Sequence, residues 1–143
     1  MKLYKILFPI VILFLSLSSC IDEPAQPVSE KEIIDNISRE WNCLMDEDGY
    51  NVDFNAVISP DGTNSKQVLI NNFHKIGNDL SVYVIVNQDL TLEIPEQAVG
   101  NQVFKGTGLI SDDYTEITWN YTIETDDNTV TQVMGKYSYG ISA

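Results

Sequence analysis

Hydrophobic and polar residues alternate with a period of two along most of the chain after residue 40. The clearest run covers residues 52–58, where every second residue is apolar: Val52, Phe54, Ala56 and Ile58. Successive side chains of a strand point to opposite faces, so this alternation predicts a strand with one buried face. The sequence Pro60-Asp61-Gly62 is typical of a turn and ends the run.

Similar runs, separated by short turn segments, lie at residues 41–45, 66–73, 80–86, 90–94, 102–110, 114–124 and 129–139. No connection is long enough to hold a crossover helix, which predicts an antiparallel meander. Eight such strands close most simply into an all-β, up-and-down barrel, because closure removes the exposed sheet edges. A two-sheet β-sandwich is the alternative.

Strand parity predicts which side chains point into the barrel. Five aromatic residues are the candidates for lining a ligand site there: Trp41, Phe54, Phe104, Trp119 and Tyr121. Aromatic residues at such positions more often form the packed core. Gly106 and Gly108 share a face with Phe104, where they either let the strand bend or leave space inside. An eight-stranded barrel is either just filled by side chains or holds one small ligand.

A short helix is expected before the strands. Ser29 and Glu32 match a capping box, and an apolar stripe follows at Ile33, Ile34 and Ile37. This pattern predicts a helix of about 10 residues that ends near Ser38 or Arg39.

The first 20 residues, MKLYKILFPIVILFLSLSSC, contain two lysines and then an apolar run. That run is about 12 residues long, short of the roughly 20 that a spanning helix needs, so it indicates a signal segment. Leu17-Ser18-Ser19-Cys20 resembles the lipobox of bacterial lipoproteins, which implies acyl chains on Cys20 that anchor the protein in a membrane. The expected parts are a signal peptide at 1–19, a lipidated cysteine with an acidic, proline-containing tether at 20–28, and a barrel domain at 29–143.

Asp22 and Glu23 follow the expected anchor closely. By resemblance, an acidic cluster at this place looks like the signal that exports lipoproteins of Bacteroidota-type bacteria to the cell surface. An acidic linker in an acidic protein is the alternative. The expected location is the outer membrane, on either its periplasmic or its cell-surface face.

Composition narrows the classes of partner. The 143 residues suit one barrel domain, and a hydrophobic content of 43% permits a packed core. The 8 basic and 21 acidic residues give a net charge of −13. A surface this negative repels phosphate backbones and anionic headgroups, so we expect neither nucleic-acid binding nor electrostatic docking to a membrane.

Three segments carry a family resemblance: Ile70-Asn71-Asn72-Phe73 with Ile76-Gly77 after it, Leu90 to Gln97, and Gly106 to Ser111. Together and in this order they look like a family of small Bacteroidota-type lipoproteins with a lipocalin-like, or calycin-like, barrel. The resemblance implies that fold from about Trp41 to Tyr139, and implies no activity. The chain departs from true lipocalins at their Gly-x-Trp motif, where it has Arg39-Glu40-Trp41.

Few residues offer candidate chemistry. His74 is the one histidine, and with no nucleophile or second ligand beside it we expect a surface or turn residue. Once Cys20 is lipidated, Cys43 has no partner in the chain and is expected to be a buried apolar residue, the alternative being an intermolecular bridge. The acidic clusters fall at predicted turns without the spacing of a calcium loop. No catalytic motif occurs, so we expect no enzyme, metal or cofactor.

Two functions remain in competition. One is a binding module that holds a small apolar or amphipathic ligand inside the barrel or at its mouth. The other is a structural or interaction protein, with a filled barrel, in an envelope complex. A hydrolase of unknown type has only the acidic residues in its favour. The volume of the interior distinguishes the first two.

Overall fold

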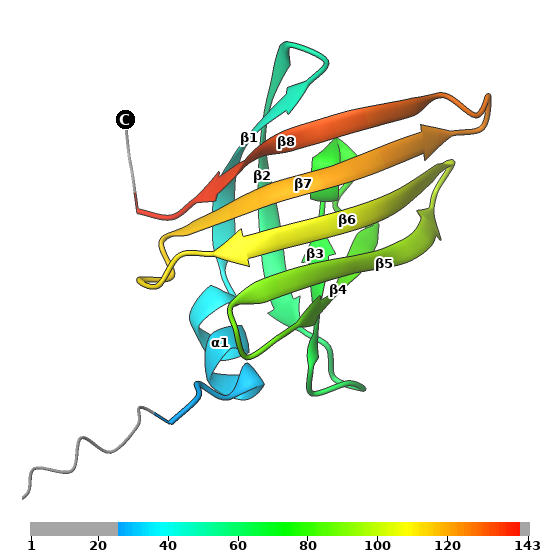
Figure 1. The fold of residues 1–143 in the computed structure, drawn as a ribbon. Helices are drawn as coiled ribbons and strands as arrows, with labels where there is room; N and C mark the ends of the chain where they lie inside the picture. Colours follow the sequence, from blue (N-terminus) through cyan, green and yellow to red (C-terminus); the bar gives the residue numbers. More distant parts are fainter. Residues whose placement is uncertain (1–25, 141–143) are drawn as a thin grey trace, which may run out of the picture.

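The strands close into a single barrel in the computed structural model, which describes residues 26–140 (Figure 1). In chain order they are β1 (Glu40–Glu47), β2 (Tyr50–Pro60), β3 (Gln67–Asn71), β4 (Ser81–Val86), β5 (Thr91–Val99), β6 (Gln102–Ile110), β7 (Glu116–Thr125) and β8 (Val130–Ser138). Each strand pairs antiparallel with the next, and β8 pairs with β1. The predicted up-and-down barrel is therefore confirmed, and the two-sheet sandwich is excluded. Among these residues no helix has the length and apolarity to span a membrane.

Two of the differences between predicted and observed strand ends have a clear local cause. The run predicted over 66–73 stops as a strand at Asn71, because Phe73 belongs to a short 3-10 helix, η1 (Phe73–Lys75). The run predicted to stop at Pro95 continues to Val99. A register shift between Ile94 and Gln97 accommodates the proline, which has no N–H to give to the ladder.

Gln97 joins β5 to β4 where their backbone ladder is short. Backbone pairing between these strands covers only Ile85 with Glu93 and Val86 with Leu92. Further along, the side-chain amide of Gln97 accepts the N–H of Tyr83 at 2.9 Å and donates to its carbonyl at 2.8 Å. One side chain therefore supplies both hydrogen bonds of a ladder rung and keeps the barrel closed.

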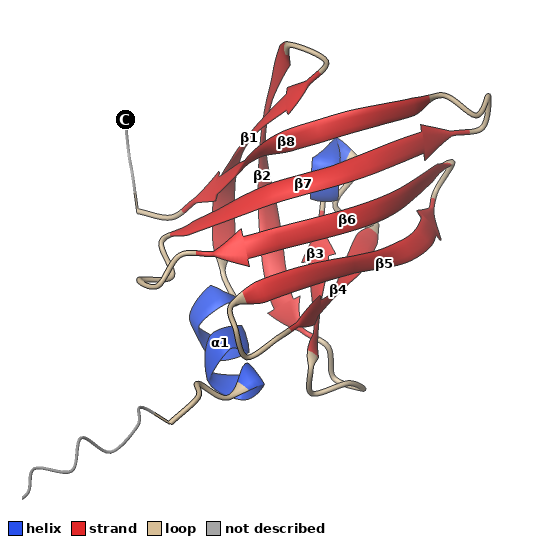
Figure 2. Cartoon of the chain, viewed as in Figure 1, coloured by secondary structure: helices blue, strands red, loops and turns tan. Residues whose placement is uncertain are grey.

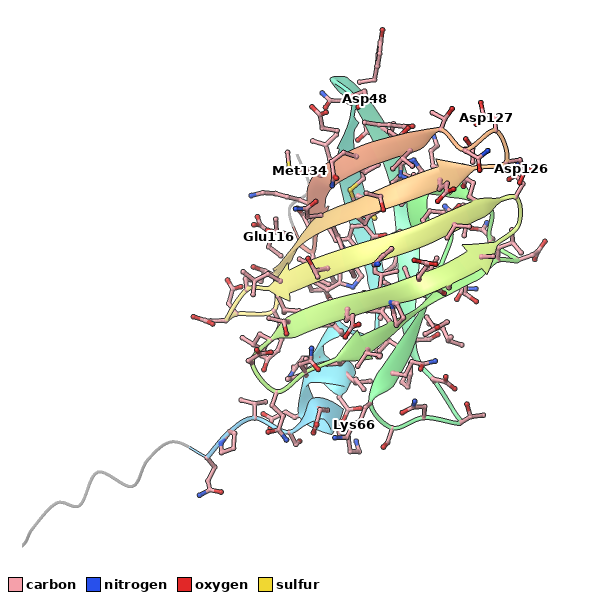
Figure 3. The ribbon with its side chains drawn as sticks, turned by 45° about the vertical axis from the view of Figure 1, so that its right-hand side comes forward. Asp48, Lys66, Glu116, Asp126, Asp127 and Met134 are labelled. Atoms are coloured by element: carbon pink, nitrogen blue, oxygen red, sulfur yellow. The ribbon has the colours of Figure 1, made fainter. Side chains whose placement is uncertain are left out.

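The predicted helix is present as α1 (Glu30–Ile37), one or two residues shorter than expected, and it covers one end of the barrel (Figure 2). Ser29 caps it by accepting the N–H of Glu32 at 3.2 Å, and the three isoleucines of the apolar stripe are buried. Polar contacts attach α1 to the barrel, among them a hydrogen bond from Gln88 to Glu30 at 3.1 Å. The indole N–H of Trp41 donates to the carbonyl of Ile37 at 2.9 Å, and Lys66 pairs with Glu30 at 3.0 Å. Figure 3 shows Lys66 beside the helix.

The acidic clusters form turns, as predicted, except that Asp46 and Glu47 of the first cluster belong to β1. In four connections an aspartate accepts the backbone N–H of the threonine two residues later, at 2.8–3.1 Å: Asp61–Thr63, Asp89–Thr91, Asp113–Thr115 and Asp127–Thr129. These hydrogen bonds stabilise the ionised carboxylate and lower the pKa of each aspartate. In the last three turns the intervening residue is left-handed, with φ between 57° and 66°.

Trp119 of β7 lies between two glycines, Gly108 on β6 and Gly135 on β8. A Cβ atom on Gly108 would come within 2.8 Å of the Trp119 ring, and one on Gly135 within 2.3 Å of the carbonyl oxygen of Leu44. The space beside both glycines is therefore already occupied by the neighbouring ring or strand. The predicted role of leaving space inside is wrong for Gly106 and Gly108, because a Cβ on either would come within 2.4–2.8 Å of β7.

Gly135→Ala should destabilise the barrel, because the new methyl group meets the backbone of β1 as well as the Met45 side chain. We expect a loss of about 1–3 kcal/mol in the free energy of unfolding, measured by urea denaturation. Gly62→Ala is the matched control, since a Cβ there meets nothing within 4 Å, and it should be nearly neutral. Equal stability of the two variants would contradict this account of the β1–β8 contact.

Candidate functional site

Phe73 lies at the centre of the barrel although it comes from a loop. Its helix η1, in the β3–β4 connection, lies toward the end opposite α1, which we call the mouth (Figure 1). The Phe73 ring is fully buried, with its centroid 4.8–6.4 Å from the ring centroids of Phe104, Trp119, Tyr121 and Tyr137. Aromatic rings attract one another at these separations. A loop side chain thus fills the space that the strands enclose.

The five predicted lining residues separate into two groups. Three of them surround Phe73: Phe104, Trp119 and Tyr121. Trp41 is fully buried beside α1, and Phe54 is half-buried on β2 with its ring edge-on to Tyr137. Strand periodicity did not place Phe73 among them, because the run over 66–73 suggested a continuous strand.

Two polar atoms in the walls around Phe73 have no hydrogen-bond partner: Nε1 of Trp119 and the hydroxyl of Tyr137. Both side chains are at most 1% exposed. The Cys43 thiol faces the Tyr137 hydroxyl, and burial raises the pKa of both groups, that of Cys43 to about 12. An unpaired buried donor costs about 1–3 kcal/mol, so a hydrogen-bond acceptor that reached either atom would be stabilised there.

His74, next in the chain, holds the loop to two strands. Its Nδ1 lies 2.7 Å from the Tyr121 hydroxyl on β7, and its Nε2 lies 3.3 Å from the Glu47 carboxylate on β1. The His74 side chain is 8% exposed, so the expectation of a surface or turn residue was wrong about its exposure. The sequence offered no signal for the contact between His74 and Tyr121, because these residues are 47 positions apart.

The loop that carries these two residues has unusual backbone geometry. Asn72, His74 and Lys75 all have positive φ, between 49° and 60°, the left-handed region that non-glycine residues seldom adopt. The Asn72 side chain compensates by donating to the carbonyl of Asn55 at 2.8 Å and accepting the N–H of Gly77 at 3.1 Å. Strained positions of this kind persist only where surrounding contacts hold them, and they cluster at functional sites.

A second candidate site lies on the outer surface of the barrel, over β5, β6 and β7. It is an open hollow of about 880 Å³. Outward-facing residues line it, among them Thr91, Glu93, Thr107, Leu109, Thr118 and Asn120. Of the five predicted aromatic residues, only Trp119 contributes to its lining. Of the four aromatic residues around Phe73, Trp119 alone therefore borders the hollow as well.

The described residues contain no group of side chains arranged to bind a metal ion. Over residues 26–140 no three side chains of histidine, cysteine, aspartate or glutamate come together as metal ligands. The turn aspartates already accept hydrogen bonds from their own loops. Their arrangement is explained by turn chemistry, the interpretation that the sequence favoured.

Comparison with known proteins adds no family. No family model matches the chain, and no curated protein is similar enough to count as a relative.

Cys43 should be unreactive in the folded protein. Its side chain is 4% exposed and its raised pKa leaves little thiolate at pH 8, and the thiolate is the reactive form. In a Cys20→Ser variant, where Cys43 is the one thiol, we expect modification by a disulfide reagent to be about a hundredfold slower in buffer than in urea. Equal rates, or a dimer on a non-reducing gel, would support the alternative of an exposed, bridging thiol.

Proposed function

We propose that the protein is a lipoprotein, held at the outer membrane by acyl chains on Cys20, whose barrel binds a small apolar or amphipathic ligand. The leading segment and Cys20 lie outside the described residues, so the anchor rests on the resemblance to the lipobox. The eight-stranded barrel is compatible with a lipocalin-like binding protein, because barrels of this size can enclose one small ligand.

One observation carries the ligand proposal: a loop side chain, Phe73, fills the centre of the barrel. A strand residue cannot leave the core without breaking the ladder, whereas η1 belongs to no strand. Departure of Phe73 would open space for about one aromatic ring or a branched apolar group. The unpaired donors of Trp119 and Tyr137 lie in the surrounding walls. The ligand expected there has an apolar body and at least one hydrogen-bond acceptor.

The alternative function is that of an interaction protein with a permanently filled barrel. The hollow of about 880 Å³ over β5, β6 and β7 favours it, since that surface is open while Phe73 occupies the interior. The two functions place binding on opposite sides of the same strands. Variants that affect one side alone therefore separate them.

Phe73→Ala should bind the probe acetophenone, a neutral single ring with a carbonyl acceptor, about tenfold more tightly than the wild type, because the probe no longer has to displace a ring. Isothermal titration calorimetry measures the dissociation constant. Truncation of a buried phenylalanine costs about 3–5 kcal/mol, so Phe73→Leu serves as a second variant if the alanine variant does not fold.

The control is Leu109→Ala, whose side chain is 56% exposed and lines the outer hollow. It should leave probe binding unchanged. Weaker binding in Leu109→Ala, with no gain in either Phe73 variant, would move the site to the outer surface. Native mass spectrometry of wild-type protein purified from its own cells would identify a retained ligand.

The anchor is tested by exchanging one cysteine at a time. Cys20→Ser should move the protein from the detergent phase to the aqueous phase in a Triton X-114 partition, because the acyl chains are lost. Cys43→Ser, which removes the buried thiol, should stay in the detergent phase. A Cys20→Ser protein that remained with the detergent would contradict the lipoprotein proposal.

A further inference from the structure

His74 is the neighbour of Phe73 in η1, and it contacts two walls of the barrel. Phe73 makes apolar contacts in the interior, while His74 makes the polar contacts at the mouth, with Tyr121 and Glu47. The ring of Phe54 packs edge-on against the imidazole, at a centroid distance of 6.3 Å. The side chain that could release Phe73 is therefore ionisable and almost enclosed.

Neutral His74 satisfies both contacts. With its proton on Nε2, the imidazole donates to the Glu47 carboxylate, and its free Nδ1 accepts the Tyr121 hydroxyl proton. The Tyr121 hydroxyl, on a side chain 1% exposed, thereby has an acceptor. Every polar atom of the contact is paired when the ring carries no charge.

Protonated His74 breaks this arrangement. Both ring nitrogens then carry protons, so Nδ1 can only donate to the Tyr121 oxygen, and the hydroxyl proton of Tyr121 loses its acceptor. A positive charge is also placed on a side chain that is 8% exposed. Glu47 on β1 opposes these costs from 3.3 Å, while Lys75 in η1 adds to them. Tyr121 on β7 stays neutral, since burial raises the pKa of its phenol.

We propose that His74 is a proton-operated latch: the neutral imidazole keeps Phe73 in the barrel, and protonation releases η1 and opens the interior to ligand. The proposal rests on the proposed function for its last step, the entry of ligand. Release of the loop itself can be measured without any ligand.

The direction of the pH effect follows from the balance of these contacts. Burial lowers the pKa of His74 below its usual 6.5, and outweighs the opposite effect of Glu47. A group with a lowered pKa in the closed state stabilises that state fully above about pH 6.5, and this stabilisation is lost as the pH falls. Acidification therefore opens the mouth.

Hydrogen exchange of three backbone amides reports the opening. The N–H groups of Lys75, Ile76 and Gly77 donate within the loop, to Asn72 or Phe73, at 3.1–3.2 Å. Between pH 7.5 and 5.5 we expect their protection factors, corrected for intrinsic exchange, to fall by up to about tenfold in the full-length wild-type protein. Amides in the β7–β8 ladder should keep theirs, which shows that the barrel stays folded.

Two variants isolate the histidine. His74→Gln keeps a polar side chain but cannot titrate, so protection of the three amides should become independent of pH. Glu47→Gln removes the charge that favours the protonated ring in the closed state, so protection at pH 5.5 should fall further than in the wild type. Greater protection at pH 5.5 than at 7.5 in the wild type would show that the His74–Glu47 ion pair closes the mouth, and would overturn the latch.

Probe titrations separate the latch from the proposed function. With both correct, acetophenone binds the wild type more tightly at pH 5.5 than at 7.5, and Phe73→Ala or Phe73→Leu binds it at both. If the Phe73 variants bind the probe and wild-type amide protection does not change with pH, the latch fails and the ligand site stands. If protection falls at acid pH and no Phe73 variant binds the probe, the ligand site fails while release of the loop stands.

Discussion

The indole of Trp119 packs directly against Gly108, with Gly135 facing it from β8, and much of the interior follows from this contact. Glycine at these two positions lets neighbouring strands approach more closely than any side chain would allow. The Trp119 ring lies in the interior beside these glycines and packs against the Tyr137 ring at a centroid distance of 5.5 Å. The space that remains next to it is taken by the Phe73 ring, at a centroid distance of 5.7 Å.

The two ends of the barrel are closed by different physical means. At the α1 end, buried isoleucines and the hydrogen bond from Trp41 to Ile37 form a contact that has no titratable group in the core. At the mouth, closure depends on left-handed loop residues and on the contacts of His74 with Tyr121 and Glu47. Backbone strain and an ionisable group make the closure at the mouth easier to reverse than the closure at α1. For this reason we place ligand entry, and its proposed control by protonation of His74, at the mouth.

The sequence predicted the regular parts of this molecule and missed the irregular ones. Period-two alternation identified the eight strands and their inward faces, because a strand with one buried face has an apolar residue at every second position. The departure of Phe73 from that order had only a weak signal in Asn72, a residue type that tolerates positive φ. The role of Gln97 and the contact of Glu47 with His74 depend on pairings between distant strands, which local patterns do not contain.

Part of the negative charge of the chain lies around the mouth of the barrel. Successive strands reverse direction, so the β1–β2 and β7–β8 turns lie at the same end as η1, and Figure 3 shows Asp48, Asp126 and Asp127 at those turns. The pKa of Asp127 is lowered by hydrogen bonds within its turn, so this carboxylate stays ionised over the range in which His74 titrates. Negative charge around the mouth then repels anions within about 8 Å at physiological salt. A ligand that enters past this rim is expected to be neutral or cationic, and its polar group to be an uncharged acceptor rather than a carboxylate.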